Sequence, residues 1–275
     1  MSDYWGKTSP RWVMPARLLD LADKLAREAA GLSGRLAPES AAGLRSLLMS
    51  SDAKSVRRSE VQQQIGDGPG FMGQDADYRH RIAEVLRLHC TSLLTAVAPV
   101  RVASIGRTRE KLYALDLKPD LWQLGQATSK ALAVFELEFR TQLSGNEQAT
   151  AADEFRMLEI MLSACICQVQ RTLEAFLPSV LRERTFNAFR CSKQILDARI
   201  DIKTAPAVLC VFIQGSLTCS EFEMFTGLRS AQARREVDRL RGVGVLELSK
   251  SKRGSLVPAF PAWLAAWLLP HLDLR

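Results

Sequence analysis

The sequence predicts a mainly α-helical protein, in which a bundle-like helical part is followed by a smaller C-terminal unit with a β-hairpin. Three observations lead to this prediction. Apolar residues recur at three- and four-residue steps through most of residues 1–200, which is the period of an amphipathic helix. Prolines and glycines divide this pattern into separate helices. In residues 201–275 the pattern is different and indicates short helices followed by short strands.

The N-terminal helical segment is expected to cover residues 1–61. Leucines and alanines at helical spacing predict one helix from Pro15 to Arg35, with charged residues on its opposite face, and a second from Pro38 to Met49. The stretch 62–77 contains the Gly66–Gly70 cluster, in which three glycines and a proline disfavour any helix. We therefore predict a flexible loop or linker there.

A helical domain that serves dimerisation or signal sensing is expected over residues 78–200. The pattern predicts helices over 78–97, from Pro119 onwards, over 150–177 and over 179–198. The pattern of residues 100–118 does not decide between helix and loop, because basic side chains interrupt the apolar spacing.

Residues 201–275 carry the most specific local signals. Helices are predicted over 205–214, 219–225 and 230–241, followed by strands around 242–246 and 255–257 that a basic turn at 249–254 joins. Thr218 and Glu221 have the spacing of a capping box, which begins the second of these helices. Gly227 supplies a turn in which a positive φ is useful, and Ser230 is expected to cap the third helix.

The third helix is expected to have two different faces. One stripe is apolar and consists of Ala233, Val237 and Leu240. The opposite side is polar and consists of Arg229, Gln232, Arg235, Glu236 and Arg239.

This arrangement resembles the winged helix-turn-helix superfamily of prokaryotic regulators. The resemblance covers about 60 residues, and the residues that carry it are Leu217-Thr218, Glu221-Phe222, Gly227-Leu228, Ala233-Arg234-Arg235, Leu240 and Gly244-Val245-Leu246. It implies a sequence-specific DNA-binding protein, a transcriptional regulator, with helix 230–241 in the major groove and the turn 249–254 as a wing on the DNA backbone.

The charge distribution agrees with double-stranded DNA as the partner. Residues 229–253 hold eight basic and three acidic residues, a local excess of +5 within a total of +7. The predicted DNA-binding residues are Arg229, Ser230, Gln232, Arg234, Arg235, Arg239, Lys250, Lys252 and Arg253. Ser230, Gln232, Arg235 and Arg239 are expected towards the bases. The wing residues Lys250, Lys252 and Arg253 are expected on phosphates.

Two alternatives remain open at the level of sequence. The C-terminal unit could mediate protein contacts in a non-enzymatic helical adaptor. A homodimer could form through the helical domain or through the apolar helix after Pro261, where Trp263 and Trp267 lie four residues apart on one face. The same helix could instead pack on the protein's own core.

Composition excludes several classes of protein. The chain has 275 residues, of which 47% are hydrophobic and 24% charged, which is typical of a globular protein and unlike a disordered one. No apolar run approaches the roughly 18–20 residues that cross a bilayer. With no signal peptide and six cysteines that form no disulfide pattern, we expect a cytoplasmic protein.

No catalytic, cofactor or metal site is predicted. Walker, dinucleotide-binding, nucleophile-elbow and His-Glu-x-x-His motifs are absent. His80, His89 and Cys90 lack the spacing of zinc ligands, and Cys165 and Cys167 point to different sides of a helix. The order of a helical part and a terminal winged helix is similar to that of Fic-type enzymes, but the His-Pro-Phe and Gly-Asn-Gly elements of such enzymes are missing. We therefore predict a protein that is not an enzyme.

Overall fold

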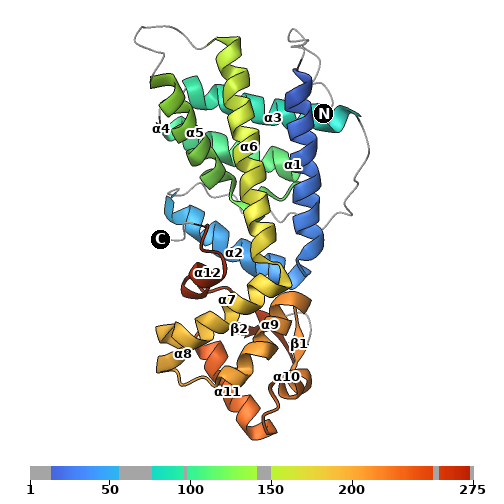
Figure 1. The fold of residues 1–275 in the computed structure, drawn as a ribbon, viewed down its shortest axis with the longest axis vertical. Coiled ribbons are helices and arrows are strands. Elements are labelled where there is room, and N and C mark those ends of the chain that lie inside the picture. Colours follow the sequence, from blue (N-terminus) through green and yellow to red (C-terminus); the bar gives the residue numbers. More distant parts are fainter. Residues whose placement is uncertain (1–13, 56–75, 96–97, 141–149, 250–253, 273–275) are drawn as a thin grey trace.

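A computed structural model describes residues 14–55, 76–95, 98–140, 150–249 and 254–272. These residues form a mainly helical fold with one small antiparallel sheet of three strands, which confirms the predicted fold class at this level (Figure 1). The first part comprises α1 (Ala16–Arg35), α2 (Pro38–Ser55), α3 (Ala76–Thr95), α4 (Ala98–Tyr113), the 3-10 helix η1 (Pro119–Trp122), α5 (Leu124–Arg140) and α6 (Ala151–Ala175). The second comprises α7 (Pro178–Cys191), α8 (Lys193–Asp197), η2 (Ile202–Thr204), α9 (Ala205–Gln214), β1 (Leu217–Thr218), α10 (Cys219–Thr226), α11 (Ser230–Gly242), β2 (Leu246–Leu248), β3 (Ser255–Pro258) and α12 (Ala262–Leu268).

The long helices α1 and α6 lie side by side, α3 and α5 pack against the upper half of α6, and α4 packs against α3 (Figure 1). Their apolar stripes meet in a continuous core. In α1 the buried residues include Leu18, Leu25 and Leu32, which are seven residues apart, as the helical period requires. The core therefore forms where the apolar spacing of the sequence predicts it.

The segment 100–118, which the sequence left undecided, is mostly helix α4. Arg109 of this helix forms an ion pair of 2.7 Å with Asp120, and Tyr113 donates a hydrogen bond to the same carboxylate. Asp120 is buried in η1, so the basic and polar residues that interrupt the apolar spacing hold a buried carboxylate in place. The helix expected from Pro119 begins as this 3-10 turn and continues as α5 after Gln123, whose φ is 50°.

Several further boundaries differ from the predictions. Helix α2 continues to Ser55 instead of ending at Met49, and β2 covers Leu246–Leu248 instead of 242–246, because α11 extends to Gly242. The expected helix 179–198 is divided into α7 and α8, because Ser192 between them has extended backbone angles. Helix α3 begins at Ala76, inside the predicted linker 62–77, and the rest of that linker lies outside the described residues.

In the C-terminal part, the sheet has the strand order β1-β3-β2 with antiparallel pairing throughout. Leu217 of β1 pairs with Leu256 of β3, and Leu246 of β2 pairs with Pro258. Helix α9 packs against β3 and α7, and α12 packs against α7. The sheet thus covers one side of the short helices.

Helix α2 lies against the C-terminal part, although the contacting residues Ser40 and Phe212 are 172 positions apart in the chain. Ser40 donates a hydrogen bond of 2.8 Å to the carbonyl oxygen of Phe212 in α9. A Cβ on Gly43 would lie only 2.9 Å from the carbonyl oxygen of Pro258, so α2 and β3 approach as closely as glycine allows. Phe212 itself stacks on Phe260, with ring centroids 5.1 Å apart. One apolar core therefore continues from the N-terminal helices into the C-terminal part.

Candidate nucleic-acid interface

The predicted capping box begins α10. The Thr218 hydroxyl accepts a hydrogen bond of 3.2 Å from the backbone N–H of Glu221, and the Glu221 carboxylate accepts one of 2.7 Å from the backbone N–H of Thr218. These bonds satisfy backbone donors that the first turn of a helix leaves unpaired. They also hold the pKa of Glu221 below its usual value. The prediction from the sequence is confirmed at this point.

The turn between α10 and α11 depends on Gly227, whose φ is 64°. Its N–H donates to the carbonyl oxygen of Glu223, which closes α10. The prediction that Ser230 caps α11 is wrong, because Arg229 occupies the N-cap position and no side chain caps the helix. Ser230 instead donates a hydrogen bond of 2.7 Å to the Glu223 carboxylate, which lies within reach across the tight turn.

The buried face of α11 is formed by Ala233, Val237 and Leu240, as predicted, and also by Glu236, which was predicted on the polar side. Glu236 is only 3% exposed. Its carboxylate accepts a hydrogen bond of 3.0 Å from the backbone N–H of Asp201 and pairs with Arg239 at 2.7 Å. A carboxylate can be buried at this position because both of its oxygens have donors.

Arg239 belongs to this internal arrangement. In addition to Glu236, its guanidinium donates a hydrogen bond of 2.9 Å to the carbonyl oxygen of Arg199. These bonds tie α11 to the segment before η2. A side chain held in this way would have to break two bonds within its own chain before it could reach a DNA base.

Three other predicted arginines lie on the exposed side of α11. Arg229, Arg234 and Arg235 are exposed, and their side chains make no ion pair or hydrogen bond with another described residue. All three lie in the N-terminal half of the helix, and its first turn holds no acidic residue. Cations near the positive end of a helix dipole cost helix stability. Only Arg229 lies at that end, whereas Arg234 and Arg235 lie beyond the first turn, where the dipole effect is small.

The remaining predicted residues are less informative. Gln232 is half-buried at the edge of the same helix. The expected wing residues Lys250, Lys252 and Arg253 lie outside the described residues, although β2 and β3 on either side of them pair as the predicted hairpin. The turn therefore starts from two strands of fixed register.

A groove of about 240 Å³ runs beside these arginines, between α10, α11 and β2. Arg234 and Arg241 line it together with Asp238, which lies 3.6 Å from Arg241. Helices α10 and α11 lie at the end of the molecule far from α3, α4 and α5 (Figure 1). The exposed arginines Arg229, Arg234 and Arg235 lie at this end of the molecule.

Exposed apolar residues beside this face were not foreseen from the sequence. Met224 is 78% exposed and Phe225 is 43% exposed, both near the end of α10, and Leu248 of β2 is 46% exposed. Apolar residues in a short helix are expected in the core. In the structure, however, α10 buries only Phe222 and Thr226, which the sequence does not indicate.

The two tryptophans of α12 differ in their surroundings. Trp263 is half-buried and donates a hydrogen bond of 3.2 Å to the carbonyl oxygen of Val243. Trp267 is 38% exposed. Trp263 thus packs on its own chain, and Trp267 is the more exposed of the two.

Comparison with protein families, with curated proteins and with solved structures finds no match to this chain. Within the described ranges, no three His, Cys, Asp or Glu side chains are grouped so that they could hold a metal ion. His89 and Cys90, the histidine and cysteine considered as metal ligands, are both buried. In the same part of the chain, no helix is both long enough and apolar enough to cross a membrane.

Proposed function

We propose that residues 205–258 form a winged helix that binds double-stranded DNA, and that the protein acts as a DNA-binding regulator. The order α9-β1-α10-α11-β2-β3 and the sheet order β1-β3-β2 support this proposal, because they place two helices and a tight turn beside a β-hairpin. In this arrangement α11 enters the major groove and the turn between β2 and β3 follows the backbone.

The observation that carries the proposal is the set of arginines on the exposed side of α11. Arg229, Arg234 and Arg235 project from the N-terminal half of the helix, which is the half that faces base edges in helix-turn-helix complexes. The local charge excess of +5 in residues 229–253 would neutralise phosphates and release counterions. Arg239 is not part of this proposed interface, because it holds Glu236 and the carbonyl oxygen of Arg199.

The test is DNA binding by the full chain at two salt concentrations, about 50 and 200 mM, followed by fluorescence anisotropy of a labelled duplex. We expect Arg234→Ala combined with Arg235→Ala to weaken binding about tenfold or more. The slope of log affinity against log salt is expected to fall by up to about 2, because each lost phosphate contact removes about 0.9 from the slope.

The matched control is Arg107→Ala combined with Lys111→Ala, which removes the same charge from two exposed positions on α4. We expect this variant to bind DNA like the wild type. Equal losses in the two variants would show a nonspecific effect of net charge, and unchanged binding in the α11 variant would contradict the proposed interface. Selection of bound fragments from a genomic pool then determines whether α11 reads sequence.

The exposed apolar residues of α10 favour a second candidate function, a helical adaptor whose C-terminal unit binds protein. Met224, Phe225 and Leu248 expose apolar side chains in this unit, and burying them against a partner would remove apolar surface from water. The simplest partner is a second copy of the chain. Sedimentation of the wild type and of a Met224→Ser, Phe225→Ser variant tests this partner: a dimer that dissociates on substitution supports it, and a wild-type monomer excludes a second copy as the partner.

A further inference from the structure

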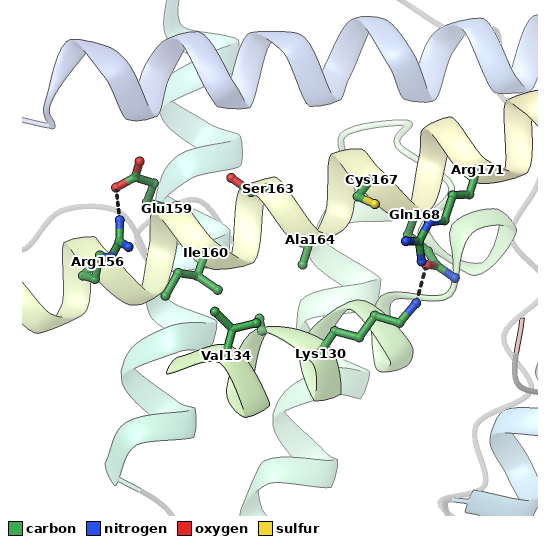
Figure 2. A pocket seen from close by; sticks show the side chains of 11 residues that line it. Lys130, Val134, Arg156, Glu159, Ile160, Ser163, Ala164, Cys167, Gln168 and Arg171 are labelled. Atoms are coloured by element: carbon green, nitrogen blue, oxygen red, sulfur yellow. Dashed lines mark hydrogen bonds and ion pairs between the residues drawn. The ribbon is translucent and has the colours of Figure 1, made fainter. Parts of the chain in front are cut away.

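Helices α5 and α6 enclose a cleft of about 350 Å³, well away from α11 (Figures 1 and 2). This volume is in the range of small-molecule sites. The side chains along the cleft fall into three zones in Figure 2: an ion pair at one end, apolar groups in the middle and cations at the other end.

The middle of the cleft is apolar. Val134 of α5 and Ile160 of α6 point towards each other across it, and Ala164 continues the same wall (Figure 2). Val134 is 45% exposed, so this surface is open to solvent in the absence of a ligand. Covering it with an apolar group would remove that area from water.

The two ends differ in how their charges are balanced. At one end Arg156 pairs with Glu159 at 3.1 Å and with Glu138 at 3.1 Å, and Glu159 also pairs with Arg17 at 2.6 Å. The cations and carboxylates at this end neutralise one another. It therefore offers no net charge to a ligand.

At the other end, Lys130 and Arg171 lie beside each other with no carboxylate partner among the described residues. The ammonium group of Lys130 donates a hydrogen bond of 3.0 Å to the side-chain oxygen of Gln168, which is only 1% exposed. Gln168 in turn donates to the side-chain oxygen of Gln126 at 3.1 Å. The lysine is thus held at the cleft by a buried, neutral group that leaves its charge uncompensated.

The same cations act on neighbouring titratable groups. Burial and the charge of Arg171 lower the pKa of Lys130. The pKa of His271, which is hydrogen-bonded to Thr172, is lowered to about 4 by burial and then by Arg184, Lys130 and Arg171. Arg184, Lys130 and Arg171 therefore all act on His271 with the same sign.

We propose that the α5–α6 cleft binds a small amphipathic anion, whose carboxylate or phosphate group contacts Lys130 and Arg171 and whose apolar body covers Val134 and Ile160. The anion supplies the countercharge that the protein lacks at this end, and both cations can donate charge-assisted hydrogen bonds to its oxygens. Binding there leaves the arginine face of α11 uncovered, so this inference does not depend on DNA binding.

Calorimetry with the full chain tests the proposal, using decanoate, decyl phosphate and the uncharged decanol as probes. We expect at least one of the two anions to bind at the cleft and decanol to bind about tenfold more weakly or not at all. The better anion identifies the headgroup. Failure of both anions, or equal binding of decanol, would overturn the proposal.

Two variants locate the site. Lys130→Gln combined with Arg171→Gln is expected to weaken anion binding about tenfold or more, whereas Arg107→Ala combined with Lys111→Ala, with the same loss of charge, is expected to have no effect. Ala164→Leu keeps every charge and fills the cleft, so it is also expected to weaken binding. Thermal unfolding checks that each variant is folded. Wild-type affinity in folded samples of both cleft variants would refute the site.

Discussion

Lowering the pH is expected to destabilise the protein through His89, which lies in α3 and is 1% exposed. Its Nε2 lies 3.1 Å from the Thr128 hydroxyl, and its Nδ1 lies 3.0 Å from the Ser104 hydroxyl. The Thr128 hydroxyl already donates to the carbonyl oxygen of Leu124, so it accepts from Nε2–H, and Nδ1 accepts from Ser104. The neutral ring therefore has both of its hydrogen bonds, and a second proton would charge a buried group.

The size of the effect follows from the pKa. Burial lowers the pKa of His89 from 6.5 to about 4, so between these values the unfolded chain binds more protons than the folded protein. The free energy of unfolding consequently falls as the pH falls through this range. For these two pKa values the loss between pH 7.5 and pH 5 is about 2 kcal/mol.

Urea unfolding of the wild type and of His89→Gln at both pH values measures this contribution. Glutamine gains no proton, so the variant is expected to be less stable than the wild type at pH 7.5 and to lose about 2 kcal/mol of this difference at pH 5. His80→Gln, on the exposed side of the same helix, controls for the removal of a histidine from α3. A difference between wild type and His89→Gln that is equal at the two pH values would refute the reasoning.

Three further predictions concern other parts of the molecule. Gly215→Ala is expected to lower the free energy of unfolding by about 2 kcal/mol or more, because φ is 81° and the new Cβ would lie 2.7 Å from a side chain of α2. Gly227→Ala, at a φ of 64° but with open space around the new Cβ, is expected to lower it by about 1 kcal/mol. Urea unfolding of the two variants measures the difference. Thr218→Ala removes the capping box and is expected to cost about 1 kcal/mol, most of which Thr218→Ser restores in the same assay. Lys130→Gln is expected to raise the pKa of His271, which burial chiefly lowers, and a proton NMR titration that finds no rise contradicts the charge excess at the cleft.

The elements that the sequence predicted well are those with local signals. The capping box of Thr218 and Glu221 and the turn at Gly227 each depend on residues within four positions of one another. The local sequence is therefore enough to predict them. The apolar stripes of α1, α6 and α11 were predictable for the same reason. The hairpin was predicted less accurately, because its first strand was expected around 242–246 and β2 covers Leu246–Leu248.

The features that were missed depend on distant partners. Glu236 was placed on the polar face of α11 because its buried partner, the backbone N–H of Asp201, lies 35 residues earlier in the chain. The cleft between α5 and α6 brings together Lys130 and Gln168, which are 38 residues apart. A single sequence shows which of these residues are charged. It does not show whether a distant residue pairs with that charge in the folded protein.

The contact between α2 and the C-terminal part bears on how this protein can be dissected. Ser40 caps a carbonyl group of α9, and Gly43 lets α2 rest directly on β3. A fragment that starts at residue 201 would leave the stacked rings of Phe212 and Phe260 uncovered on the side that α2 shields. Shortened versions intended for interaction studies therefore need to retain the N-terminal helix pair, supplied in the same chain or as a separate peptide.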